Sequence, residues 1–146
     1  MTNNFERCAA IGKKYERITT QIFENTRFEI MEGYFPDYDV ALYNDGQETV
    51  YFECKSDSFA VRTNALAIEF EYDGRPSGIQ TTKADFWIHY LQGSNRYYLI
   101  PTEYLRQVLS DGKWSNTVRG GDGRRSRLYI VEAKHFEQYH DTYVVS

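Results

Sequence analysis

Apolar residues spaced three and four apart dominate the first part of the chain. They include Phe5, Ile11, Tyr15, Ile18 and Ile22. This spacing puts them on one face of a helix, which we expect to run from residue 4 to about residue 25. Such an apolar face predicts that the helix packs against a sheet.

Beyond this helix the pattern changes to the alternation that is typical of strands. Residues 26–31 form one short strand, and residues 38–43 and 49–54 form two longer ones. Asn44 to Gly46 supply turn residues between the two longer strands. We therefore expect these two strands to pair as an antiparallel hairpin.

The rest of the chain mixes both kinds of element. Strands are expected at residues 66–72, 96–100 and 128–131, helices at 102–109 and 132–139, and loops at 56–64 and 113–127. Residues 77–85 are expected to form a loop that enters a short helix. Residues 86–91 are core material, in which His89 is a hydrogen-bonded structural histidine. This order predicts an α/β protein with a central mixed β-sheet of four to five strands flanked by helices.

Length and composition limit the class of protein. With 146 residues, 41% of them hydrophobic, the chain is expected to form a single domain over residues 1–146. Cys8 and Cys54 are expected to be buried free thiols, and no zinc-binding pattern is present. The sequence has no apolar run long enough to span a membrane and no apolar N-terminal stretch typical of a signal peptide. We expect an intracellular protein.

Three charged residues of the hairpin are predicted to converge. Glu53 and Lys55 are two residues apart, so they point to the same side of their strand. The hairpin places Asp39 beside Glu53, with Asp37 as the alternative carboxylate. Two carboxylates suit Mg²⁺, and an ammonium group can orient a metal-bound water or stabilise charge on a phosphate. An ordinary cross-strand ion pair is the alternative interpretation.

The arrangement of Asp39 followed by Glu53-Cys54-Lys55 resembles the active site of the PD-(D/E)xK nuclease superfamily. The resemblance extends over roughly residues 9–100 and implies a restriction-endonuclease-like fold with a Mg²⁺ site, in which Mn²⁺ substitutes. It implies Asp39 and Glu53 as metal ligands and Lys55 as a catalytic residue. It also implies a ligand from the first helix, for which Glu16 is preferred over Glu6 and Glu24, and a polar residue beyond the Glu-x-Lys strand. Candidates for that last position are Gln80, which we assign to the catalytic set, and Lys83.

One segment is locally basic in a chain whose net charge is −4. It is the glycine-containing stretch 113–127, and its arginines are Arg119, Arg124, Arg125 and Arg127. Arginines on a loop suit contact with a phosphate backbone, which predicts DNA as the partner. A solvated hairpin loop is the alternative interpretation.

These patterns leave more than one function open. The first is a Mg²⁺-dependent DNA endonuclease of resolvase, restriction or homing type, which the resemblance implies to be a homodimer. The second is a non-catalytic nucleic-acid-binding or subunit-interaction module on the same fold. A third is an enzyme acting on another phosphate substrate, which needs the metal site but not the arginines.

Overall fold

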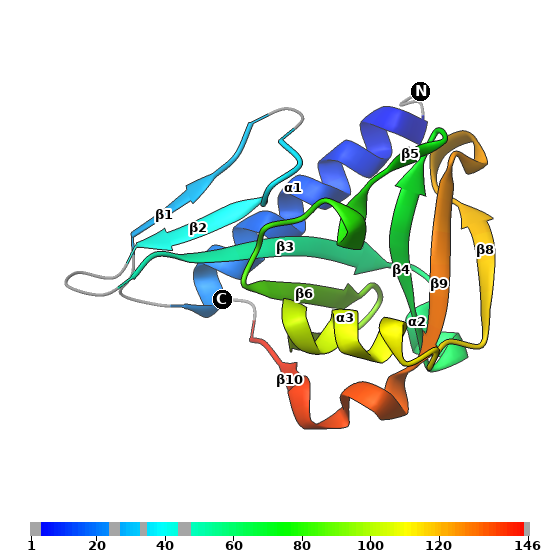
Figure 1. The fold of residues 1–146 in the computed structure, drawn as a ribbon. Helices are drawn as coiled ribbons and strands as arrows, with labels where there is room; N and C mark the ends of the chain where they lie inside the picture. The colour runs from blue at the N-terminus through cyan, green and yellow to red at the C-terminus, as the bar shows by residue number, and fades with distance from the viewer. Residues whose placement is uncertain (1–3, 24–26, 33–34, 44–47, 145–146) are drawn as a thin grey trace.

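The computed structural model of this protein describes residues 4–23, 27–32, 35–43 and 48–144 (Figure 1). The predicted turn at residues 44–46 lies outside these ranges, as do Glu24 and the side chains of Glu6 and Cys8. The helices and 3-10 turns are α1 (Asn4–Ile22), α2 (Ala60–Thr63), η1 (Gly78–Gln80), α3 (Thr102–Ser110), η2 (Asp122–Arg124) and η3 (Ala133–Tyr139). The strands are β1 (Arg27–Ile30), β2 (Val40–Tyr43), β3 (Val50–Asp57), β4 (Ala65–Tyr72), β5 (Arg75–Pro76), β6 (Phe86–Leu91), β7 (Arg96–Pro101), β8 (Asn116–Gly120), β9 (Ser126–Glu132) and β10 (His140–Thr142).

The larger sheet is mixed, as the sequence predicts. Its strand order is β1-β2-β3-β6-β7-β10. The strands β2 and β3 form the expected antiparallel pair, whereas β3 and β6 run parallel. The described residues give this sheet six strands, so the prediction of four to five is wrong. The three residues of β10 were not predicted to form a strand because their pairing with β7 depends on a distant part of the chain.

The second sheet has the order β5-β4-β9-β8 and stands beside the end of β3 (Figure 1). The strand predicted at residues 66–72 exists as β4, but it belongs to this separate sheet. The prediction of a loop over residues 113–127 is wrong, because β8 pairs antiparallel with β9 and Arg119 lies opposite Arg127. The glycines and the asparagine of this segment have low strand propensity, so pairing with β9 helps to specify the strand β8.

The helix α1 covers one face of the larger sheet, as predicted (Figure 1). Its buried Tyr15 and Ile18 pack in one cluster with Val40, Phe52 and Tyr90. The free thiol of Cys54 packs against this cluster. It forms a hydrogen bond with the hydroxyl of Thr19 on α1, in which either group can be the donor. The apolar face of α1 therefore packs against the larger sheet, as its spacing predicts.

The other face of the larger sheet is covered by α3 and by the second sheet. Trp87 and Ile100 from the larger sheet share a core with Leu105 of α3, with Ile68 of β4 and with Phe136 of η3. Alternate residues of β3 face away from α1, toward the junction of the two sheets. Glu53, Lys55 and Asp57 are these residues.

Two further predictions of local structure are wrong. Residues 56–64 are not a loop, since β3 continues to Asp57 and α2 follows. The backbone N–H groups of Phe59 and Ala60 donate to Asp57 Oδ1 at 2.9 and 3.0 Å, which starts this short helix. The closing helix is a 3-10 segment, η3, rather than an α-helix. Within the described residues, no helix is long and apolar enough to cross a membrane.

Candidate active site

The hairpin brings Asp39 and Glu53 together. Val40 lies opposite Phe52. Asp39, which precedes Val40, is therefore a neighbour of Glu53, which follows Phe52. The carboxylate of Asp39 accepts a hydrogen bond from the backbone N–H of Cys54 at 2.8 Å, and its carboxyl group is hydrogen-bonded to that of Glu53. The predicted proximity of these two carboxyl groups is confirmed.

The alternative carboxylate, Asp37, lies elsewhere. Its Oδ2 forms an ion pair with Lys83 Nζ at 3.8 Å, and both side chains are substantially exposed. The backbone carbonyl of Asp37 accepts hydrogen bonds from the backbone N–H of Lys83 and from the hydroxyl of Thr82. Asp37 and Lys83 therefore fasten the segment before β6 to the start of the hairpin, and Asp39 is the carboxylate beside Glu53.

Glu53 is the most strongly perturbed acid of this group. The residue is only 7% exposed. Burial raises the pKa of its carboxyl to about 8; the nearby Lys55 ammonium opposes this shift, and the charge of Asp39 adds to it. The proton that Glu53 retains fits its hydrogen bond to Asp39, because two adjacent carboxylates do not both ionise readily.

Glu16 approaches this pair from α1. Burial raises the pKa of its carboxyl, the nearby Lys13 ammonium lowers it, and the charge of Asp39 raises it further. Its buried Oε1 lies 3.2 Å from Lys13 Nζ but has no partner in good hydrogen-bonding geometry. The helix thus carries a third carboxylate with an incompletely satisfied oxygen to the edge of the Asp39–Glu53 pair.

Lys55 lies between two carboxylates from different sheets. Its Nζ is 3.9 Å from Glu53 Oε2 and 3.9 Å from Glu69 Oε2, and it lies over the ring of Trp87. Desolvation alone would lower the pKa of this ammonium, but Glu53 and Glu69 outweigh it, so the pKa is raised. The sequence left open whether Glu69 approaches the metal site or simply faces solvent.

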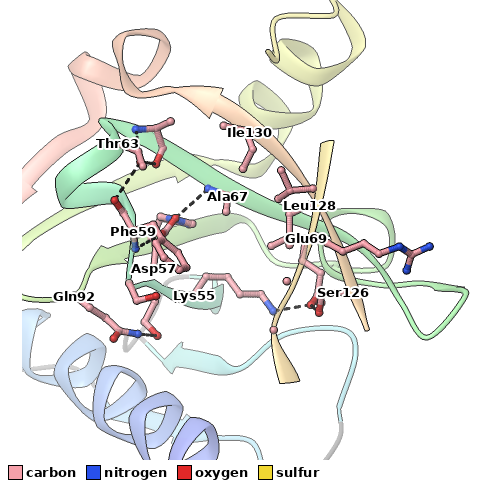
Figure 2. A pocket seen from close by; sticks show the side chains of 18 of the residues that line it. Lys55, Asp57, Phe59, Thr63, Ala67, Glu69, Gln92, Ser126, Leu128 and Ile130 are labelled. Atoms are coloured by element: carbon pink, nitrogen blue, oxygen red, sulfur yellow. Dashed lines mark hydrogen bonds and ion pairs between the residues drawn. The ribbon is translucent and has the colours of Figure 1, made fainter. Parts of the chain in front are cut away.

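Beyond Lys55, β3 ends in a buried polar network. Asp57 Oδ2 accepts hydrogen bonds from the backbone N–H of Ala67 at 2.9 Å and from His89 Nε2 at 3.0 Å (Figure 2 shows Asp57 and Ala67). His89 Nδ1 in turn accepts from Trp87 Nε1, so a neutral imidazole satisfies every partner. The pKa of Asp57 is lowered to about 2, because the hydrogen bonds from His89, Ala67 and Phe59 outweigh the effect of burial. His89 is therefore structural, as predicted, and Asp57 joins the two sheets.

Gln80 stands apart from these groups in the structure. It is the last residue of η1, and its side chain is exposed. The residue of this segment that does contact the site is Thr82, which is 2% exposed and hydrogen-bonded to Glu53. Nothing in the local sequence indicates this contact, because a threonine before an expected helix has the common role of a cap.

The four arginines of the basic segment have different surroundings. Arg119, Arg124 and Arg125 are exposed on the β8–β9 hairpin. Arg127 is half-buried, forms an ion pair with Glu71 at 3.3 Å and lies over the ring of Phe70. Trp114 packs on Tyr129 with ring centroids 5.1 Å apart. This basic surface therefore belongs to a sheet, and Arg127 is committed to an intramolecular pair.

A groove of about 620 Å³ opens beside Lys55. Figure 2 shows Lys55 pointing along it toward Glu69, with Phe59 on one side and Leu128 and Ile130 from β9 on the other. Arg119 contributes to its far wall. The groove thus connects the lysine to the basic hairpin.

The donor set fits a hard divalent cation. Mg²⁺ is usually held by one or two carboxylates while keeping several waters, and Asp39 and Glu53 supply such a pair of oxygen donors. Among the described residues, His, Cys, Asp and Glu form no group of three or more in a metal-binding arrangement. Lys13 and Lys55 instead neutralise Glu16 and Glu53, so a cation would have to displace ammonium groups and the proton of Glu53.

No protein-family description matches the sequence, and no curated protein sequence is similar to it. Solved structures do show similarity. The chain overlays on the bacterial homing endonuclease I-Ssp6803I with a TM-score of 0.56 and 14% identity, over 89% of this chain and 80% of that one. It also overlays on the Holliday junction resolvase Hjc of Archaeoglobus fulgidus with a TM-score of 0.49 and 11% identity, over 88% of each chain.

The overlay on the homing endonuclease shows the fold. The chain has a restriction-endonuclease-like α/β fold with a mixed central sheet flanked by helices, so the predicted fold class is confirmed. Identity at this level carries no residue roles from one protein to another, and function must be argued from the site itself.

Proposed function

We propose that this protein is a Mg²⁺-dependent DNA endonuclease that hydrolyses phosphodiester bonds, with Mn²⁺ as a substitute metal. One observation carries the proposal. The carboxyl group of Asp39, which precedes β2, adjoins that of Glu53 on β3, and Lys55 lies beside Glu53 on the same strand, inside a restriction-endonuclease-like fold. The nuclease character of the structural neighbours is consistent with this chemistry.

In this proposal Asp39 and Glu53 hold the metal, and Glu16 completes the set from α1. When bound, Mg²⁺ would supply Lewis-acid polarisation of the phosphate and a lower pKa for an attacking water. Lys55 orients that water or stabilises charge that develops on the phosphate, from its position next to Glu53. Gln80, exposed at the end of η1, is proposed to contact a water or phosphate of the bound DNA.

The β8–β9 hairpin is proposed to contact the DNA backbone. Arg119, Arg124 and Arg125 offer exposed guanidinium groups for phosphates. Arg127 is assigned to the same surface, where its pair with Glu71 limits it to orienting the hairpin unless DNA displaces that carboxylate. We further propose a homodimer, because cutting both strands of a duplex is simplest with two sites; sedimentation equilibrium of the protein tests this.

A second candidate is a non-catalytic DNA-binding or interaction module. It is favoured by the ion pair of Glu16 with Lys13 and by the proton that Glu53 retains. Calorimetric titration with Mg²⁺ and Mn²⁺ separates the two candidates. The nuclease requires binding that disappears in Glu53→Gln, whereas the module requires none.

The direct test is cleavage of linear, supercoiled, branched and single-stranded DNA in Mg²⁺ and in Mn²⁺. We expect cleavage of at least one substrate, no cleavage in EDTA and none by Glu53→Gln. Thr20→Ala serves as the control variant, because this exposed-helix substitution leaves the site untouched. Intact DNA of every form under both metals would contradict the proposed function.

A further inference from the structure

We propose that Glu69 is a positioning residue. When a divalent cation binds Glu53, Glu69 becomes the counter-ion of the Lys55 ammonium. The inference rests on the proposed function for the cation, and on the geometry of Glu69 for the exchange. It gives a role to a carboxylate that lies outside the predicted metal set and on the other sheet.

The first observation is that Lys55 is shared. Its Nζ is equally far, 3.9 Å, from the nearest oxygens of Glu53 and Glu69 (Figure 2 shows the contact to Glu69). Both distances exceed the length of a hydrogen bond, so neither carboxylate holds the ammonium in a direct bond. The lysine side chain is 31% exposed, which leaves its stem room to move toward either partner.

The second observation is that Glu69 is fixed. Ser126 Oγ donates to Glu69 Oε1 at 2.6 Å, and Ser77 Oγ donates to Glu69 Oε2 at 3.1 Å. Ser126 is 5% exposed, so this support is buried. Two hydroxyl donors from different elements therefore hold the carboxylate while the lysine remains adjustable.

The local backbone is also built around Glu69. The pairing of β4 with β9 shifts register between Glu69 and Glu71, a bulge of the kind that re-aims a side chain. Gly78 adopts φ +54°, and a Cβ there would meet the carbonyl of Glu69. Glycine at this position is what lets η1 bring Ser77 against the Glu69 carboxylate.

The exchange follows from charge. A divalent cation at Asp39 and Glu53 repels the Lys55 ammonium at a distance of a few ångströms. Glu69 gives the ammonium a counter-ion outside the cation's own ligands, so the lysine stays beside the site without competing for Glu53. Without Glu69, the carboxylates that act on Lys55 are Glu53 and Asp39, the proposed cation ligands, and the ammonium opposes cation binding.

The test is a double-mutant cycle on cation affinity, measured by calorimetry with Mn²⁺ and with Ca²⁺ in the absence of DNA. We expect Glu69→Gln to weaken affinity by about tenfold when Lys55 is present and by less than about twofold in the Lys55→Met background. Glu71→Gln is the matched control, since it removes the same charge from the same strand. It should change affinity by less than about twofold in both backgrounds.

A second measurement reports on Lys55 without any cation. The ¹⁵N-ammonium NMR resonance of Lys55 should shift or be lost through exchange in Glu69→Gln and stay unchanged in Glu71→Gln. Equal weakening of cation affinity by Glu69→Gln in both lysine backgrounds would overturn the exchange, as would an unchanged Lys55 resonance. A wild-type protein that binds neither cation overturns the proposed function and the exchange with it, while the resonance still decides whether Glu69 holds Lys55.

Discussion

The two charged regions of this protein are held in different ways. Glu53 and Lys55 lie on β3 of the larger sheet and Asp39 directly precedes its partner β2, so the strand register fixes their separation. The exposed Arg119 and Arg124 sit on the β8–β9 hairpin of the smaller sheet, in contact with solvent. Charges of the first region interact over a few ångströms in a desolvated environment. Charges of the second region interact through solvent and are screened by salt over a Debye length.

This difference teaches where each kind of substitution should be felt. Changes in the buried carboxyl–lysine group alter proton and cation equilibria sharply, because desolvation magnifies charge. Changes on the hairpin alter DNA affinity gradually, because each phosphate contact adds a screened increment. The four predictions below test this contrast, from the largest expected effect to the smallest.

The largest effect is expected for Lys55→Met, which keeps the length of the side chain and removes its charge. Cleavage should fall by about 10²- to 10⁴-fold, the range for loss of a group that acts in proton transfer or charge stabilisation. Cation affinity should stay the same or rise, since a like charge is removed. Cleavage kinetics and calorimetry measure the two quantities. Cleavage at the wild-type rate would show that Lys55 is structural and would contradict its catalytic role.

The next effect concerns Asp57, which joins the two sheets that carry these regions. Asp57→Asn should lower the free energy of unfolding by about 2–4 kcal/mol, because a buried ionised acceptor of several hydrogen bonds becomes a donor facing other donors. Urea denaturation measures this. Asp73→Asn is the control: Asp73 is an exposed turn residue at φ 51°, a conformation that asparagine tolerates, and the change should be within about 0.5 kcal/mol.

The pH dependence of Glu53 should be visible without DNA. The folded pKa of about 8 lies above the ordinary value of 4.5, so the folded state keeps a proton that the unfolded state has lost. The cation-free protein should therefore lose stability as pH rises from 4.5 to 8, while affinity for Mn²⁺ increases over the upper part of that range. Thermal unfolding and calorimetry at several pH values check this. In Glu53→Gln the contribution should vanish, and a wild-type-like pH profile in that variant would assign it to another group.

The smallest effect is expected on the hairpin. Replacing both Arg119 and Arg124 by alanine should reduce the slope of log affinity for DNA against log salt by about one to two units, with cation binding unchanged. Fluorescence anisotropy over a salt series measures the slope. Lys134→Ala on η3 is a control for loss of one positive surface charge. An unaltered slope in the arginine variant would show that these two arginines make no contact with DNA phosphates and that the hairpin is an ordinary solvated surface.

The sequence predicts the site best where the structure depends on local rules. Alternation along β3 places Glu53 and Lys55 on one side, and the short hairpin brings Asp39 to them, so three residues could be assigned together. These relations span a few residues or one turn and need no knowledge of the rest of the fold.

The parts that sequence could not provide depend on contacts between the two sheets. Glu69 differs from Glu71 only because Ser77 and Ser126 meet it from other elements. The strand β8 was predicted as a loop because its stability comes from pairing with β9 rather than from its own residues. Gln80 and Thr82 are two residues apart, and only the path of the chain after η1 decides that Thr82 contacts Glu53.

The parallel pairing of β3 with β6 has a consequence for how the protein is made. The strands β2 and β3 can pair as soon as their hairpin is complete. Phe52 of β3 can pair with Phe86 of β6 only after the intervening elements α2, β4, β5 and η1 have been synthesised. Such long-range pairing is slow compared with closing a hairpin. We expect a chain being synthesised to carry Asp39 and Glu53 on a partly exposed hairpin until β6 has emerged and joined β3. The time at which a new chain first becomes able to bind a cation is then set by residues that never touch it.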